Sequence, residues 1–135
     1  MSSFEILEHT ADVGVRARAA SLEGLFEQAT YGLLEIIGAL QPGDGRDVVI
    51  EVAARDVAAV LVDWLSEVLY VQDTQDAVVT RVDVTEVDSS RAVGSVGLRE
   101  RSGTLEGTAV KAITYHQLKV VRDGSDWLAE FYVDV

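Results

Sequence analysis

Three short segments, far apart in the sequence, carry the residues that could do chemistry. The first ends in Asp12, the second contains Lys111, and the third is the final pair, Asp134-Val135. Each segment has apolar, strand-like neighbours, where a charged group is costly unless it is partnered. The carboxylates offer oxygen ligands to a hard cation such as calcium or magnesium, and the lysine offers a positive charge to a phosphate.

Asp134 is the most informative of these residues. Its side chain and the carboxylate of Val135 lie close together, and two like charges repel each other unless a cation or a lysine neutralises them. A frayed, solvated terminus would remove the problem. The aromatic run before it, Trp127 to Val133, indicates instead that this end of the sequence is docked as a strand.

The other candidates also have simple structural interpretations. The local sequence favours a turn aspartate for Asp12, bonded to nearby backbone N–H groups. Lys111 is interpreted as an outward-facing strand lysine. Alternatively, it pairs with Asp12 or Asp134, or its charge is presented to a phosphate. His9 and His116, the only histidines, are interpreted as hydrogen-bonded structural residues.

Composition narrows the classes of function. The 135 residues carry a formal charge of −12, with 11 basic against 23 acidic side chains, so tight autonomous nucleic-acid binding is disfavoured. The absence of cysteine excludes disulfides and thiolate zinc sites. There is no secretory pattern at the start and no apolar run of about 20 residues, so a cytoplasmic protein is expected.

Periodicity predicts a single α+β domain over residues 1–135, in which two amphipathic helices cover a largely antiparallel or mixed sheet. Ser21 and Asp56 are the expected N-caps of the helices, and the first helix should end near Gly38. A bulge is expected around Tyr115 in the longest strand. The predicted strands cover residues 4–9, 13–19, 47–53, 77–87, 91–98, 108–122 and 127–135.

Three carboxylates of the second helix fall on one margin of its apolar stripe. At about 100° per residue, Asp56, Asp63 and Glu67 line up there, with Glu67 close to the angle of the buried Trp64. A boundary carboxylate commonly turns out to solvent, and that is the interpretation the spacing favours.

Five segments, in order, resemble the archease family over nearly the whole chain. The opening motif is Glu-His-Thr-Ala-Asp, the two helix motifs are Leu-Glu-Gly-Leu-Phe-Glu-Gln-Ala and Leu-Val-Asp-Trp-Leu-Ser-Glu-Val-Leu-Tyr, the lysine motif is Val-Lys-Ala-Ile-Thr-Tyr, and the ending is Asp-Val. They span residues 8–12, 22–29, 61–70, 110–115 and 134–135. One departure is the stretch 96–107, which is short and lacks a histidine that family members often carry.

The resemblance implies a function that composition does not. Archeases assist the RtcB-type RNA ligase, which uses GTP and a divalent metal to join RNA ends in tRNA splicing and repair. They promote guanylylation of the ligase and its multiple turnover, without catalysis of their own. Carried over by motif, Asp12, Asp134 and Val135 would hold a divalent cation, calcium in the first place and magnesium or manganese as alternatives, with Lys111 in an activating role beside them.

Two other functions are compatible with the same residues. A metal-dependent phosphoesterase acting on RNA ends could use the clustered carboxylates, although the sequence offers no further nucleophile or base. A calcium-stabilised, chaperone-like interaction module is the second alternative. The sequence shows no large exposed apolar stripe to support it.

Overall fold

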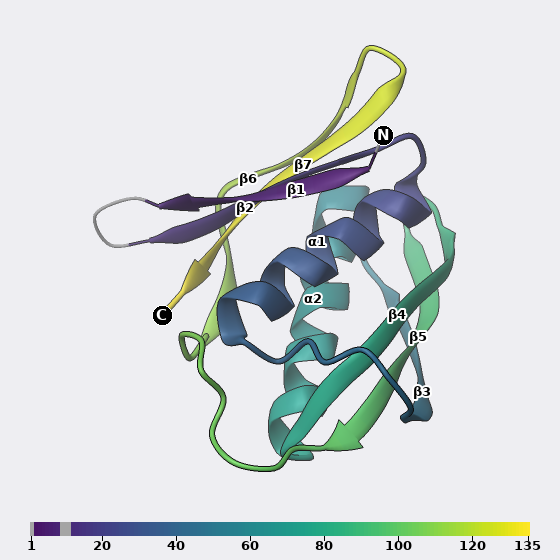
Figure 1. Cartoon of the computed structure of the whole chain (residues 1–135). Helices are drawn as coiled ribbons and strands as arrows, with labels where there is room; N and C mark the ends of the chain where they lie inside the picture. Colours follow the sequence, from purple (N-terminus) through teal and green to yellow (C-terminus); the bar gives the residue numbers. More distant parts are fainter. Residues whose placement is uncertain (1, 9–11) are drawn as a thin grey trace.

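The computed structural model describes residues 2–8 and 12–135. These residues form two helices and seven strands, which confirms the predicted α+β class (Figure 1). The elements in chain order are β1 (Ser3–Glu8), β2 (Val13–Ala19), α1 (Leu22–Ile37), β3 (Arg46–Ala53), α2 (Val57–Thr74), β4 (Ala77–Val87), β5 (Arg91–Glu100), β6 (Ala112–Asp123) and β7 (Asp126–Asp134).

The strands divide into two antiparallel sheets with the helices between them. The four-stranded sheet has the order β1-β2-β7-β6, and the three-stranded sheet has the order β3-β5-β4. Helix α1 contacts β1 and β2 on one side and β4 on the other, while α2 contacts β6 and β3 (Figure 1). The outer face of each sheet is therefore free of any covering helix.

Both helices begin, and α1 ends, at the residues that the sequence predicted. The Ser21 hydroxyl accepts a hydrogen bond from the N–H of Gly24 at 3.0 Å, and the Asp56 carboxylate accepts one from Ala59 at 2.8 Å. Gly38 ends α1 in the left-handed conformation, with φ of 75°, which a residue without Cβ adopts at little cost. No helix in residues 2–8 and 12–135 is long and apolar enough to cross a membrane.

Trp64 joins the two helices at the centre of the core. Its side chain is fully buried, and its indole N–H donates to the Thr30 hydroxyl at 2.9 Å. That hydroxyl in turn donates to the Phe26 carbonyl at 2.6 Å. A buried polar network in which each group has a partner fixes how α1 and α2 pack, because any other packing leaves the indole N–H unsatisfied.

The segment between β5 and β6 differs from the prediction. β5 continues to Glu100, and β6 begins at Ala112, four residues later than expected. Thr108 lies against the end of α1 instead, where its N–H donates to the Ile36 carbonyl at 2.7 Å. Gly107 makes this close approach possible, since a Cβ there would lie 2.3 Å from the same carbonyl oxygen.

The predicted bulge in β6 is confirmed. Pairing with β7 jumps from Thr114–Tyr132 to Lys119–Glu130, so β6 carries extra residues at this point. Gln117 has a positive φ of 53°, an unusual conformation for a residue other than glycine. The bulge lies at the outer edge of the four-stranded sheet, because β6 is an edge strand.

Candidate functional site

Three of the predicted site residues come together where β7 ends. Val133 of β7 pairs with Val13 of β2 on one side and with Ile113 of β6 on the other. Asp12 directly precedes β2 and Asp134 is the last residue of β7, so continuing this register by one residue places Asp12 opposite Asp134. Directly opposed residues of paired strands have Cβ atoms about 5 Å apart. Figure 1 shows the start of β2 and the end of β7 at the same end of the sheet.

The register also settles which face of the sheet the two aspartates are on. Val133 is fully buried and Ile113 is 7% exposed, so this row of side chains faces the helices. Because side chains alternate along a strand, Asp12 and Asp134 belong to the outer face. Asp134 is exposed and Asp12 is half-buried.

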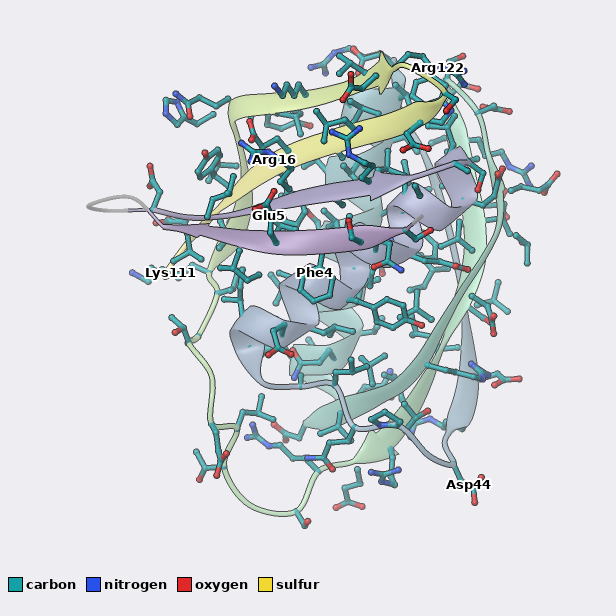
Figure 2. The ribbon with its side chains drawn as sticks, turned by 45° about the horizontal axis from the view of Figure 1, so that its top comes forward. Phe4, Glu5, Arg16, Asp44, Lys111 and Arg122 are labelled. Carbon is teal, nitrogen blue, oxygen red and sulfur yellow. The ribbon has the colours of Figure 1, made fainter. Side chains whose placement is uncertain are left out.

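Lys111 is tied to this end of β7 through its backbone. Its N–H donates to the Asp134 carbonyl at 2.7 Å, and the next residue, Ala112, pairs directly with Asp134. We call Asp12, Lys111, Asp134 and Val135 the carboxylate tip. In Figure 2 the Lys111 side chain extends away from the ribbon.

The carboxylate tip has few internal partners. In the described part of the chain, no ion pair involves Asp12, Lys111 or Asp134. Residues 2–8 and 12–135 also bring no three His, Cys, Asp or Glu side chains together as a metal centre. The donors that the tip offers are oxygen atoms, which fit calcium or magnesium, but calcium takes 6–8 such ligands. The three carboxylates of the tip fill only part of such a coordination shell when each binds through one oxygen.

Tyr132 lies beside the tip, and the sequence analysis did not identify it. It is 4% exposed although it lies on the outer face, because its ring covers Gly14 of β2. A Cβ on Gly14 would lie 2.6 Å from the ring, so only glycine leaves room for it. A glycine opposite an aromatic residue on a neighbouring strand was the available signal, but it needs the register to be read.

His116 and Tyr115 project from the bulge of β6. The His116 ring lies edge-on to Tyr132 with centroids 6.4 Å apart, and both His116 and Tyr115 are exposed. The Arg55 guanidinium lies 5.8 Å from the centre of the Tyr115 ring, at the start of α2. His9, the other predicted structural histidine, lies outside the described residues.

Carboxylates on the outer faces of both sheets are arranged differently from those of the tip. On the four-stranded sheet, Arg16 donates to Glu130 at 2.9 Å and to Glu5 at 3.1 Å, and Lys119 lies 3.8 Å from Glu130. The hydrogen bond that Arg16 donates to Glu130 is the main cause that raises the pKa of Arg16. Each of these charged groups therefore has an opposite charge within reach.

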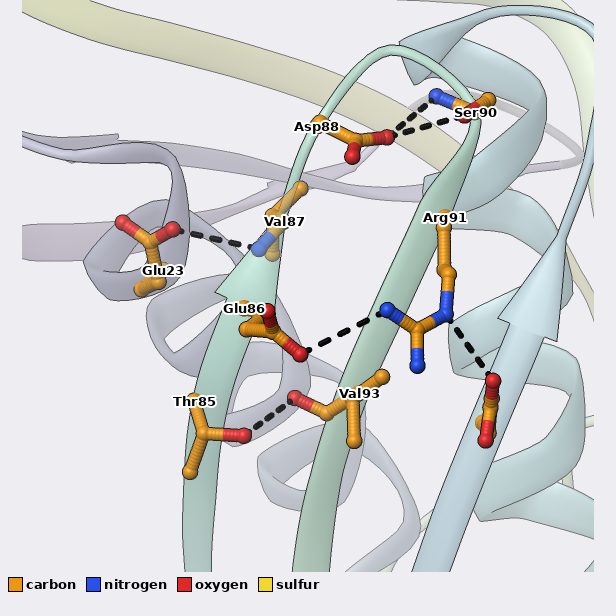
Figure 3. A network of polar contacts seen from close by, with 9 residues as sticks. Glu23, Thr85, Glu86, Val87, Asp88, Ser90, Arg91 and Val93 are labelled. Carbon is orange, nitrogen blue, oxygen red and sulfur yellow. Dashed lines mark hydrogen bonds and ion pairs between the residues drawn. The ribbon is translucent and has the colours of Figure 1, made fainter.

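The three-stranded sheet repeats this arrangement. Arg91 of β5 donates to Glu51 of β3 at 2.9 Å and reaches Glu86 of β4 at 3.5 Å (Figure 3). The hydrogen bond with Glu51 raises the pKa of Arg91. At the adjoining turn, Asp88 accepts hydrogen bonds from the backbone N–H and the hydroxyl of Ser90, and these lower the pKa of its carboxyl group.

Comparison with known proteins covers nearly the whole chain. The model of the Archease protein family matches residues 4–135. Proteins named archease from Saccharolobus islandicus and Thermococcus kodakarensis are 36% and 35% identical to the chain, and in both alignments all of this chain and all of the relative are covered.

Solved structures agree with these matches. The solution structure of Methanobacterium thermoautotrophicum protein 1598 has a TM-score of 0.72 and 27% identity, covering 98% of this chain and 99% of that one. The crystal structure of an archease from Thermotoga maritima, described as a possible chaperone, has a TM-score of 0.68 and 25% identity, covering 97% of this chain and 96% of that one.

Proposed function

The chain belongs to the archease family, and we propose that it activates an RtcB-type RNA ligase. The observation that carries the proposal is the carboxylate tip, where Asp12 directly precedes β2, Asp134 ends the adjacent strand β7, and Lys111 bonds to Asp134 through its backbone N–H. Charged groups that form no ion pair with any residue in 2–8 and 12–135 are available to a second molecule. A cytoplasmic location is part of the same proposal.

Asp12, Asp134 and Val135 would hold a divalent cation, and calcium is our first choice, with magnesium or manganese as alternatives. When bound, the cation would neutralise the carboxylates and could contact the phosphates of GTP or an oxygen ligand of the ligase. With each carboxylate of the tip binding through one oxygen, the remaining ligands would come from water or from the ligase. Binding of the cation and binding of the ligase should therefore strengthen each other.

Lys111 would act at the phosphates of the nucleotide. An ammonium group that forms no ion pair with the described residues can approach an anion. The bond from the Lys111 backbone N–H to the Asp134 carbonyl keeps this residue beside the two aspartates. Substituting Lys111 with alanine removes the charge but keeps that backbone bond. The stimulation should fall, while cation binding at the two aspartates persists.

The charge of the chain supports a role that works through a partner. A net charge of −12 opposes RNA binding by the chain alone, and it favours approach to the basic RNA-binding surface that a ligase must have. An autonomous phosphoesterase would need its own nucleophile or base close to the cation. The described residues around the tip offer Lys111, Thr114 and His116 but no arrangement of hydrogen bonds that activates any of them.

Ligase turnover tests this proposal. The RtcB-type ligase of the same organism is assayed with excess RNA, GTP and manganese, with the chain present at a substoichiometric amount. We expect more than one ligation per ligase molecule only when the chain is present. Unchanged guanylylation and turnover would contradict the proposal, and release of phosphate from RNA ends by the chain alone would favour the phosphoesterase.

A further inference from the structure

Helix α2 presents a narrow exposed face whose charged residues are all acidic. Residues of this face are exposed or half-buried and recur at helical spacing: they are Asp63, Ser66, Glu67, Tyr70 and Asp73. We call this set the α2 ridge. Between Val57 and Thr74 the helix contains no lysine or arginine, so no cation on the helix itself balances the three carboxylates.

The negative charges of the α2 ridge destabilise helix α2. Asp63 and Glu67 are four residues apart, and like charges at that spacing destabilise a helix. Asp73 lies in the last turn, where the helix dipole disfavours a negative charge. These three charges therefore do not stabilise the helix itself.

Carboxylates elsewhere in the molecule form ion pairs with arginine side chains. Arg16 and Arg91 each hold two glutamates on the sheet faces (Figures 2 and 3). By contrast, Asp63, Glu67 and Asp73 take part in no ion pair with any described residue. The difference is a second observation, independent of the acidic composition of the helix.

Tyr70 is the residue of the α2 ridge on which a bound side chain could pack. It is 62% exposed in the middle of the ridge and lies between two surface hollows, both of which also include Ser66. One hollow, of about 440 Å³, lies towards the edge strand β3 and contains Asp63 and Glu67. The other, of about 280 Å³, lies towards β6 and contains Asp73 and Lys111.

We propose that the α2 ridge docks an arginine-bearing segment of the ligase, and this inference rests on the proposed function. An exposed tyrosine ring flanked by carboxylates suits a guanidinium, which can stack on the ring and bond to the carboxylates at its edge. Lys111 belongs both to one hollow and to the carboxylate tip. A protein that receives the tip therefore also meets the ridge. RNA does not fit this surface, because its phosphates are repelled by the carboxylates.

The test separates docking from activation. The ridge variant is Asp63→Lys combined with Glu67→Lys, and the matched control is Asp44→Lys combined with Glu106→Lys, which changes the net charge equally at two exposed residues of other segments. Ligase binding is measured by calorimetry and stimulation by titration of the chain. The ridge variant should bind at least tenfold more weakly and need correspondingly more protein for half-maximal stimulation, with the maximal stimulation retained.

Three further measurements complete the experiment. Tyr70→Ala should also weaken binding, and raising the salt concentration should weaken binding of the wild type more than that of the ridge variant. Asp63→Asn combined with Glu67→Gln removes the like-charge repulsion on the helix without creating a new one, so the thermal midpoint of this neutral variant should not fall. A drop in midpoint would mean that the carboxylates stabilise the fold and would overturn the inference.

The docking inference and the proposed function would fail with different experimental results. Equal ligase affinity for the wild type and the ridge variant, while Asp134→Asn loses stimulation, overturns the docking inference and leaves the proposed function intact. Unchanged ligase affinity with altered RNA binding by the complex would assign the ridge to RNA and also overturn it. A wild-type chain that does not bind the ligase at all overturns both proposals.

Discussion

Carboxylates are placed in two different ways in this molecule. On the outer faces of the sheets they are paired with arginine, as Glu130 is with Arg16 and Glu51 is with Arg91. At the carboxylate tip and along the α2 ridge, the aspartate and glutamate side chains form no ion pair with any described residue. The first arrangement stabilises the fold, and the second leaves charge available to another molecule. Exposure alone does not separate the two, because both regions are at the surface.

Substitution of Asp134 with asparagine should have the largest effect. Asparagine replaces the negatively charged carboxylate of Asp134 by a neutral amide, which is a weaker ligand for a cation. We therefore expect stimulation of the ligase to fall at least tenfold. The urea midpoint should not fall, since no ion pair is broken. Asp44→Asn is the control, because Asp44 is an exposed aspartate at the opposite end of the molecule from Lys111 (Figure 2). Normal stimulation by Asp134→Asn would show that the tip is not the site.

Glu27→Ala should show the reverse pattern. The half-buried Glu27 carboxylate accepts a hydrogen bond from the Val84 N–H at 2.9 Å, and it joins α1 to β4. Leaving that N–H unsatisfied should cost about 1–2 kcal/mol of the free energy of unfolding, measured by urea denaturation. Stimulation at a temperature where the variant is folded should match the wild type. Glu35→Ala, at an exposed position of the same helix, should leave both quantities unchanged.

Glu130→Gln should have a smaller effect on stability. Its carboxylate is 13% exposed and bonds to Arg16, with Lys119 close by, so its charge contributes more than that of a fully solvated pair. We expect a loss of about 1 kcal/mol by urea denaturation, and this loss should shrink at high salt. A loss of ligase stimulation at unchanged stability would instead place Glu130 with the tip.

Ser90→Ala should have the smallest effect, and it should depend on pH. Ser90 lowers the pKa of Asp88 below its ordinary value of 3.8. A carboxyl group whose folded pKa is lowered stabilises the fold above its unfolded pKa, and this contribution is lost as the pH falls through the folded value. The small difference in thermal midpoint between wild type and Ser90→Ala should therefore be present at pH 7 and diminish below about pH 4. A difference that does not change between pH 7 and pH 3 would assign the effect of Ser90 to the turn and not to the charge.

The sequence was sufficient for features that depend on local chemistry. Ser21 and Asp56 could be identified as caps, and Gly38 as the end of α1, because capping uses residues within one turn of the helix. The division of the strands into two sheets was not predicted, because a period of two shows which face is buried but not which strand is the neighbour. The late start of β6 has the same cause: residues 108–111 are apolar enough for a strand, but β7 ends before it can pair with them.

The candidate site shows a similar limit. Nothing local brings Asp12, Lys111 and Asp134 together, and only the family resemblance had grouped them before the register was known. The α2 ridge was partly visible, because helical spacing aligned Asp63 with Glu67. The participation of Asp73 and Tyr70 was not, since it depends on where β3 and the segment before β6 lie beside the helix.

The most direct test compares two carboxylates of one strand. Asp134→Asn and Glu130→Gln are made separately, and both ligations per ligase molecule and the urea midpoint are measured for each. The account predicts that Asp134→Asn loses stimulation at unchanged stability, whereas Glu130→Gln loses stability and retains stimulation. If both variants lose stimulation only in proportion to stability, the unpaired carboxylates have no special role and the central claim is wrong.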